Sequence, residues 1–120
     1  MILCRAEEHL KSGRSVVVDN TNPDADSRSR YVNLAIKYKV PVRCFLMSTT
    51  YKHARHNEKF RQLTNKDHKP IPEMVVNSYK SKYTEPSLSE DFTEVVRVNF
   101  VPDFASETQK KTYMLHLLEK

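Results

Sequence analysis

The stretch Arg14-Ser-Val-Val-Val-Asp-Asn20, with Thr21-Asn22-Pro23 directly after it, decides the predicted fold. Three consecutive valines favour a central β-strand whose two faces are both covered. Asn22 can cap a helix that follows, and Pro23 suits its first turn because the missing N–H is not needed there. The sequence therefore predicts a buried strand over residues 14–20, then a tight turn, then a helix.

Helices and strands are predicted on both sides of this turn. Helices are expected over residues 1–12 (with Gly13 as C-cap), 24–39, 51–65 and 72–83. Further strands are expected over residues 40–48, 93–101 and 113–118, with an irregular stretch over 102–109. Strand, helix and strand within residues 14–48 form a βαβ unit, which implies parallel strands and a right-handed crossover. The predicted fold class is therefore α/β, with a parallel sheet flanked by helices.

Two of these helices differ in character. The helix over residues 24–39 is predicted to bury one face, which carries Arg28, Val32, Ala35 and Ile36. The helix over residues 51–65, capped by Thr49 or Thr50, has few apolar residues and many cations. It buries little, so it is predicted to be a mobile lid rather than part of the core.

Composition limits the classes of function. The 120 residues carry a formal net charge of +5, and residues 42–82 hold nine lysines and arginines against three acids. A basic middle favours an anionic partner such as nucleic acid or nucleotide, although a solvated basic surface explains it as well. No apolar run approaches the ~18 residues of a membrane span, and no signal peptide is apparent, so we expect an intracellular protein without a membrane partner. Cys4 and Cys44 lack metal-binding spacing and are expected to be reduced thiols.

Polar side chains fill the turn after the predicted first strand. Asp19 ends that strand, and ligands of open α/β sheets bind outside the carboxyl ends of strands. Asp19 is therefore a candidate catalytic or Mg²⁺-linked carboxylate, and Asn20, Thr21 and Asn22 can hydrogen-bond a phosphate or a ribose. The alternative is ordinary turn chemistry, in which Asp19 holds the turn and Asn22 caps the helix.

The predicted lid helix supplies the other candidates. Arg55 and Arg61 are its candidate phosphate contacts because planar guanidinium groups fork onto phosphate oxygens. Asn57 joins them because it projects on the same side of the helix as Arg61. The alternative is a structural role for each arginine. No metal site is predicted, because His53 and His56 have no further ligands at suitable spacing.

Several motifs together resemble the polynucleotide kinase/phosphatase family, in the C-terminal part of its kinase domain. The order and spacing of the motifs hold from about residue 3 to residue 100. The motifs that carry the resemblance are Val16-Val-Val-Asp-Asn-Thr-Asn-Pro-Asp24, Ser27-Arg-Ser-Arg-Tyr31, Pro41-Val-Arg-Cys-Phe-Leu46, Ala54-Arg-His-Asn-Glu-Lys-Phe-Arg61, Ile71-Pro72 and Ser78-Tyr-Lys80.

The resemblance implies an ATP-dependent kinase that transfers the γ-phosphoryl group of ATP to the 5′-hydroxyl of DNA or RNA, with Mg²⁺. In the animal enzymes of the family this domain accompanies a 3′-phosphatase domain and works in nuclear DNA repair with scaffold proteins. Arg61, followed by Arg55, matches the arginine that the family holds against the ATP phosphates, and Asp19 matches an aspartate that supports the active site. The expected nucleic-acid contacts are Arg43, Lys80 and Lys82.

The chain departs from the family pattern at the phosphate loop. A loop of the form G-x-x-x-x-G-K-[ST] needs two glycines, and Gly13 is the single glycine of this sequence. The phosphate loop is therefore not expected. The resemblance implies that the strand before the loop and the aspartate that accepts the hydroxyl proton, which precede this region in the family, are missing as well. We predict a partial phosphate-loop kinase domain that is inactive alone. Its expected parts are a βαβ core over residues 1–48, a helical lid region over 49–84 and a C-terminal strand region over 85–120.

Other interpretations stay open at this point. The chain can be a nucleic-acid-binding fragment without catalysis, part of another phosphate-loop kinase for a small molecule, or a fragment with an exposed sheet edge that does not fold stably. The kinase interpretation depends on one arrangement: Asp19 and Arg61 should face a common cleft beneath the cationic lid.

Overall fold

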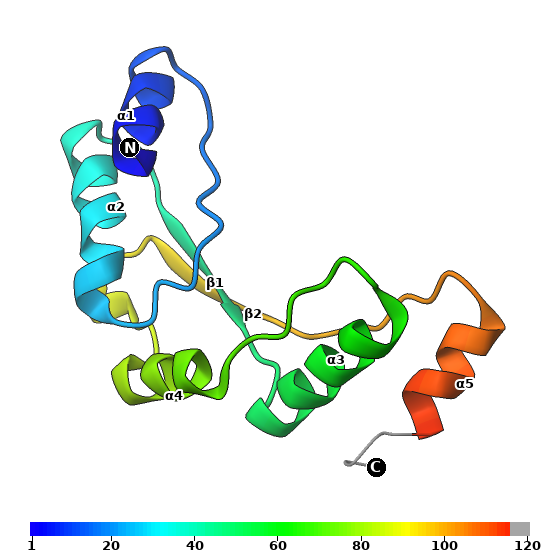
Figure 1. The fold of residues 1–120 in the computed structure, drawn as a ribbon. Helices are drawn as coiled ribbons and strands as arrows, with labels where there is room; N and C mark the ends of the chain where they lie inside the picture. The colour runs from blue at the N-terminus through cyan, green and yellow to red at the C-terminus, as the bar shows by residue number, and fades with distance from the viewer. Residues whose placement is uncertain (116–120) are drawn as a thin grey trace. The chain divides into compact units, whose positions relative to one another are not determined.

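The computed structural model describes residues 1–115 of the chain. None of the described helices is long and apolar enough to cross a membrane. The described elements are α1 (Ile2–Lys11), α2 (Ala25–Lys37), β1 (Arg43–Met47), α3 (Tyr51–Thr64), α4 (Glu73–Lys82), the 3₁₀-helix η1 (Leu88–Glu90), β2 (Glu94–Val98) and α5 (Glu107–Leu115) (Figure 1).

The chain divides into two compact units, and each is described by itself. The first unit comprises Met1–Leu46 with Asn77–Val96, and the second comprises Met47–Val76 with the described residues from Arg97 onward. All four predicted helices are confirmed with slightly different ends. The C-cap of α1 is Ser12 rather than the predicted Gly13. Gly13 comes directly after it in the left-handed region, with φ at 74°, where a residue without Cβ is favoured.

The core of the first unit lies around α1 and α2, which pack side by side (Figure 1). The predicted buried face of α2 is confirmed at Arg28, Val32 and Ala35, which are 2–5% exposed. The predicted burial of Ile36 is wrong, because its side chain is 55% exposed. Leu34 is buried instead. Leu34 lies in the apolar contact with α1, so the buried arc of α2 turns toward that helix.

The start of α2 corrects the predicted cap. Asp24, not Asn22, is the N-cap: its Oδ1 accepts a hydrogen bond of 2.8 Å from the Ser27 backbone N–H, and the Ser27 hydroxyl completes a capping box. The Ser27 N–H stabilises the ionised carboxyl and so lowers the pKa of Asp24. Asn22 instead turns the chain in the left-handed region, with φ at 39°, a conformation that asparagine tolerates.

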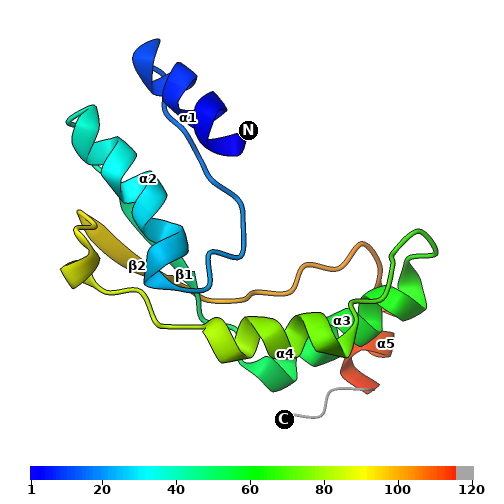
Figure 2. The ribbon, with the colours of Figure 1, turned by 60° about the vertical axis from the view of Figure 1, so that its left-hand side comes forward.

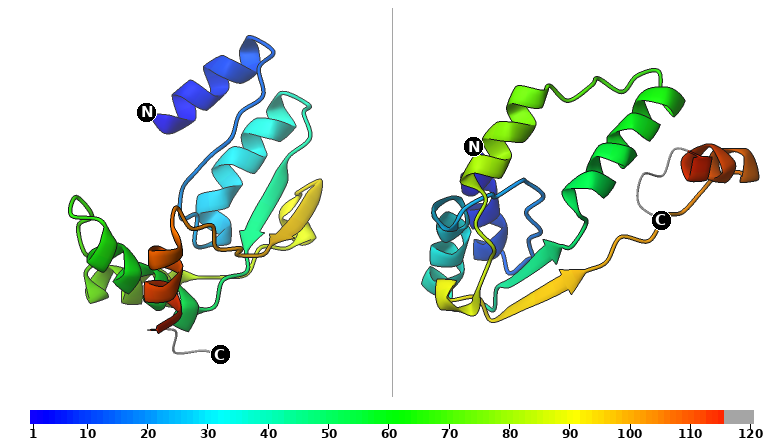
Figure 3. Two further views of the ribbon diagram at one scale, coloured as in Figure 1. Left: turned by 90° about the vertical axis from the view of Figure 1, so that its right-hand side faces the viewer. Right: turned by 90° about the horizontal axis from the view of Figure 1, so that it is seen from below.

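β1 and β2 form a parallel two-stranded sheet, as the two arrows of Figure 3 show. The Thr93 N–H donates to the Val42 carbonyl at 2.8 Å near the start of the strands. The Ser48 N–H donates to the Val98 carbonyl at 3.0 Å near their ends. The predicted strands over residues 40–48 and 93–101 are therefore confirmed in shorter form, and the parallel sheet with them.

The strand predicted over residues 14–20 is wrong. This stretch runs extended beside α1 and α2 but pairs with neither β1 nor β2 (Figure 2). Its backbone from Ser15 to Asp19 forms no hydrogen bond with any residue that the structure describes. A strand needs a neighbour whose backbone groups form hydrogen bonds with its own. Among the described strands, β1 pairs with β2 and not with this stretch. The predicted βαβ unit and its right-handed crossover are consequently not formed over residues 1–48.

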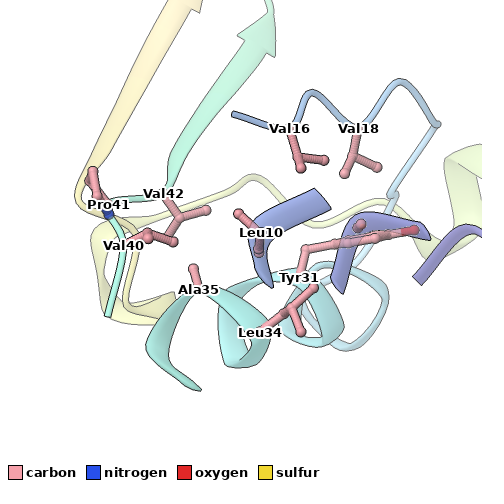
Figure 4. A pocket seen from close by; sticks show the side chains of 10 residues that line it. Leu10, Val16, Val18, Tyr31, Leu34, Ala35, Val40, Pro41 and Val42 are labelled. Atoms are coloured by element: carbon pink, nitrogen blue, oxygen red, sulfur yellow. The ribbon is translucent and has the colours of Figure 1, made fainter. Parts of the chain in front are cut away.

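Apolar side chains nevertheless hold this extended run in place. Val16 and Val18 are half-buried and point toward a pocket that Leu10 of α1, Leu34 of α2 and Val42 also line (Figure 4). Val17 lies on the other face of the run and is 88% exposed. The valine triplet is therefore covered on one face only, whereas the sequence predicted cover on both.

The second unit contains α3 and α5, which contact each other. The Thr50 side chain caps α3, as predicted, by accepting from the His53 backbone N–H. The strand predicted over residues 113–118 is wrong up to Leu115, because those residues belong to α5; the rest lie outside the described residues. The Ser106 hydroxyl accepts from the Gln109 N–H at 3.2 Å and so starts this helix. The predicted C-terminal strand region thus consists of β2 followed by a helix.

Candidate functional site

The turn after the extended run brings four predicted site residues together. Asp19, Asn20 and Thr21 are exposed, and Asn22 is half-buried. Asn20 fixes the turn locally, because its Oδ1 accepts a 2.8 Å hydrogen bond from the Thr21 N–H. The Asp19 carboxylate makes no hydrogen bond with the described part of the chain. Asp19 therefore does not hold the turn, and its carboxylate stays open to an external group.

The ion pair between Arg28 and Glu90 holds this turn in place. Arg28, 4% exposed, donates from Nε to Oε1 of Glu90 at 2.8 Å and from Nη2 to Oε2 at 3.1 Å. Its Nη1 donates to the Asn22 carbonyl at 3.0 Å, and Nη2 also reaches the Thr84 hydroxyl at 3.2 Å. The bidentate bond from Arg28 lowers the pKa of Glu90, and the same bond raises the pKa of Arg28. The guanidinium thus links the turn to the segment that follows α4.

A second bond joins the end of α4 to the same turn. The Thr84 N–H donates to the Pro23 carbonyl at 2.8 Å, one residue past the turn. Lys80 and Lys82, the predicted nucleic-acid contacts, are exposed near the C-terminus of this helix. The charge of Lys82 reaches Asp24 and contributes to the lowered pKa of that carboxyl. The structure therefore brings Lys82 close to Asp24 at the start of α2, a grouping that the sequence did not predict.

Arg43, the remaining predicted nucleic-acid contact, begins β1. Its side chain is exposed, and its guanidinium lies over the Phe45 ring, 5.4 Å from the ring centroid. Phe45 is itself 51% exposed. Stacking on a neighbouring ring holds the guanidinium on the surface of the strand. Its predicted contact with nucleic acid stays a prediction.

α3 has the cationic surface that the sequence predicted. Its one buried residue is His56, and its lysines and arginines lie on the surface. The Arg55 guanidinium stacks over the Tyr51 ring at 5.9 Å from the centroid, and this contact restricts its side chain. The exposed cations are Lys52, Arg55, Lys59 and Arg61.

The Asn57 side chain of α3 is hydrogen-bonded within the described part of the chain. It is half-buried, and its Oδ1 accepts a 2.7 Å hydrogen bond from the Tyr113 hydroxyl of α5. That contact occupies the carbonyl side of the amide and leaves the NH₂ side as the donor for a ligand. Asn57 as a phosphate contact stays a prediction, restricted to its amide hydrogens.

An aromatic cluster on α3 and α5 was missed from the sequence. Tyr113, 4% exposed, lies edge-on to His56 with centroids 4.4 Å apart, and its hydroxyl also bonds His53 Nε2 at 2.5 Å. His56 is 5% exposed, and its Nε2 has no hydrogen-bond partner among the described residues. Phe60, Phe100 and Phe104 complete the cluster. The Ser106-x-x-Gln109 capping pattern was the signal that places a helix here.

Asp19 and Arg61 belong to different units. Asp19 lies in the first unit with the turn, Lys80 and Lys82, and Arg61 lies in the second with the other cations of α3. Each half of the predicted site is therefore formed within its own unit. Their common cleft stays a prediction.

At the turn, the described residues offer the Asp19 carboxylate, rather than a set of ligands, for a divalent cation. No group of three or more histidine, cysteine or acidic side chains is suitably placed for a metal within residues 1–115. Magnesium in phosphoryl-transfer sites is often held by one or two carboxylates, phosphate oxygens and water. The open carboxylate of Asp19 fits that supporting role.

Comparisons with known proteins identify related sequences. A family model described as an AAA domain matches residues 1–86. The chain is 40% identical over 95 residues to the bifunctional polynucleotide phosphatase/kinase of Schizosaccharomyces pombe, covering 79% of this chain and 23% of that protein. It is 34% identical over 103 residues to the putative bifunctional polynucleotide phosphatase/kinase of Acanthamoeba polyphaga mimivirus, covering 84% of this chain and 24% of that protein.

The chain thus spans about a quarter of the length of these curated relatives. The matched residues include the valine triplet, the Asn20–Asn22 turn, β1, α3 and α4, so the resemblance predicted from the motifs is confirmed. This chain belongs to the AAA-domain family of phosphate-loop kinase-like proteins and, within it, to the polynucleotide kinase/phosphatase family.

Proposed function

We propose that this chain supplies the lid and the nucleic-acid-binding surface of an ATP-dependent polynucleotide 5′-hydroxyl kinase. The observation that carries the proposal is α3: fourteen residues with one buried side chain and exposed cations at Lys52, Arg55, Lys59 and Arg61. A helix that buries so little is stabilised mainly at its cap and aromatic cluster, so its cationic side chains are available to anions. Similarity to named polynucleotide phosphatase/kinases supports a nucleic-acid substrate.

Each group of residues has a role in this proposal. Arg61 and Arg55 fork onto the phosphates of ATP and stabilise the charge that develops during phosphoryl transfer. The open carboxylate of Asp19 orients the water shell of Mg²⁺, and the Asn20–Asn22 turn supplies hydrogen-bond donors beside it. Lys80 and Lys82 at the end of α4 hold the phosphates of the DNA or RNA strand, and so does Arg43 on β1.

The 120 residues taken by themselves are proposed to bind nucleic acid without transferring phosphate. Their one glycine cannot provide the two that a phosphate-cradling loop uses. Phosphoryl transfer depends almost entirely on positioning and charge stabilisation, so the lid and turn alone leave the reaction without its main phosphate cradle. A role in nuclear DNA repair, beside a 3′-phosphatase domain and scaffold proteins, is part of the same proposal.

Binding to oligonucleotides should depend strongly on salt. We expect the chain to bind a fluorescent single-stranded oligonucleotide bearing a 5′-hydroxyl, with an affinity that falls as salt rises. Replacing Arg43 or Lys82 with Gln should weaken binding and reduce the slope of log affinity against log salt by about 0.7 each, because one contact with the phosphates of the strand is lost. Fluorescence anisotropy over a salt series measures both quantities.

Lys11→Gln is the matched control for charge, because Lys11 is exposed on α1 and lies outside the site. This variant should keep the slope of the unsubstituted chain. A slope that is unchanged in both Gln variants would exclude Arg43 and Lys82 from the nucleic-acid-binding surface.

The isolated chain should show no phosphoryl transfer. Incubation with γ-labelled ATP, Mg²⁺ and a 5′-hydroxyl oligonucleotide is expected to leave the oligonucleotide unlabelled, because no phosphate loop is present. Clear turnover would contradict the proposal.

A second candidate function is that of a small-molecule kinase, which competition with nucleosides tests. Displacement of the bound oligonucleotide by nucleosides would favour this second candidate.

A further inference from the structure

Two tyrosines form an aromatic pair at the C-terminal end of α4. Tyr79 and Tyr83 are one helical turn apart, with ring centroids at 5.8 Å and ring planes tilted by 38°. Tyr79 is 38% exposed and Tyr83 is 40% exposed. No residue of α4 is buried. The two rings therefore present neighbouring apolar surface to solvent at the end of a helix that contributes no buried side chain.

This pair is fixed beside the candidate site. Thr84, which follows Tyr83 directly, donates from its N–H to the Pro23 carbonyl at 2.8 Å. Its hydroxyl also accepts from the buried Arg28, which in turn holds the Asn22 carbonyl. All of these residues lie within the first unit. Thr84, at the end of the pair, is thus linked to this turn region directly through Pro23 and indirectly through the Arg28 side chain.

Positive charge accompanies the aromatic surface. Lys80 and Lys82 alternate with the two tyrosines along the chain, and both lysines are exposed. Aromatic rings interleaved with cations suit a polymer that combines flat bases with a phosphate backbone. The exposed lysines are complementary to an anionic partner, and the paired rings suit flat bases, so the chemistry of the surface favours single-stranded nucleic acid.

We infer that Tyr79 and Tyr83 form a stacking platform for the unpaired bases of the nucleic-acid strand whose phosphates Lys80 and Lys82 contact. This inference rests on the proposed function and adds to it the part of the substrate that α4 recognises. Stacking is tolerant of sequence because every base has a flat face. The platform therefore holds single-stranded ends without selecting their sequence.

A cycle of substitutions on both partners isolates stacking from charge. One partner is a short 5′-hydroxyl oligonucleotide, compared with a strand of equal length in which every base is replaced by an abasic residue. The other partner is the full chain, compared with its double variant Tyr79→Leu/Tyr83→Leu, which keeps apolar bulk and helix propensity. The unsubstituted chain should prefer the base-bearing strand by about tenfold or more, and the double variant should lose most of that preference.

Two controls separate stacking from folding. Tyr79→Phe/Tyr83→Phe should keep the preference because the ring faces remain, and Tyr38→Leu, at the opposite end of α2 from the turn, should keep it as well. Binding can also be followed without a label, because the chain has six tyrosines and no tryptophan, so stacked bases quench a pure tyrosine emission.

The outcomes distinguish the inference from the proposed function. Salt-dependent binding with equal affinity for base-bearing and abasic strands would overturn the platform and leave the proposed function standing. Failure of the unsubstituted chain to bind either strand would overturn both. Loss of preference in the leucine variant, with retention in the phenylalanine variant, supports the platform.

Discussion

Arg28→Met should lower the free energy of unfolding by about 3–5 kcal/mol, as expected when one partner of a buried ion pair is removed. The substitution leaves the Glu90 carboxylate, whose side chain is 15% exposed, without its bidentate donor. It also leaves the Asn22 carbonyl and the Thr84 hydroxyl without the guanidinium. Urea unfolding followed by circular dichroism measures the change.

Arg30→Met is the matched control, because Arg30 is exposed on the same helix. It should change the free energy of unfolding by no more than about 0.5 kcal/mol. A similar small change for Arg28→Met would contradict the view that this pair fixes the turn.

The same pair predicts a dependence on pH. Because Arg28 lowers the pKa of Glu90 in the folded chain, the stabilisation is fully present above the ordinary glutamate pKa. It is lost as the pH falls below about 4.3 and through the lowered value. Glu90→Gln removes the titrating group, so the stability difference between the unsubstituted chain and this variant should shrink in that range.

Tyr113→Ala should cost the second unit about 3–5 kcal/mol, the range for deleting a large buried aromatic ring. The ring is 4% exposed and contacts His56, Phe60 and Phe104. Burial also raises the pKa of its hydroxyl, because it disfavours the ionised form. Loss of helical signal and of cooperative thermal unfolding is the expected result.

Tyr113→Phe separates packing from hydrogen bonding. It keeps the ring and removes the hydroxyl that bonds Asn57 and His53, so it should cost about 1–3 kcal/mol. Met114→Ala, on the 55% exposed neighbour, is the control and should be nearly neutral. Equal stability of the alanine variant and the unsubstituted chain would mean that α5 contributes nothing to the unit.

Local signals in the sequence predicted most of the helices and two of the strands. The cap at Thr50, the left-handed Gly13 and the apolar spacing of α2 depend on neighbours within a few residues, so the sequence suffices for them. The strand predicted at the valine triplet was wrong because a strand depends on a distant partner, and none of the described strands pairs with residues 14–20. Apolar periodicity reports burial but not pairing.

In the candidate site, too, features that depend on nearby residues were predicted, and those that depend on distant partners were not. Asp19 and the Asn20–Asn22 turn were predicted from their place after an apolar run, and the structure confirms that they form one turn. The role of Arg28 was not predicted. Its place in the apolar stripe of α2 signalled a buried charge, but its partner Glu90 is 62 residues away in sequence. Nothing local identifies that partner.

The parallel pairing of β1 and β2 has a consequence for how the chain reaches its native state. Val42 and Thr93, which bond where the two strands begin, are 51 residues apart. Closing so long a loop costs chain entropy before the contact repays it, whereas helices form from nearby residues. During synthesis on the ribosome, β1 emerges well before the strand that completes its ladder. The helices between them are therefore expected to form first, and assembly of the sheet should set the folding rate.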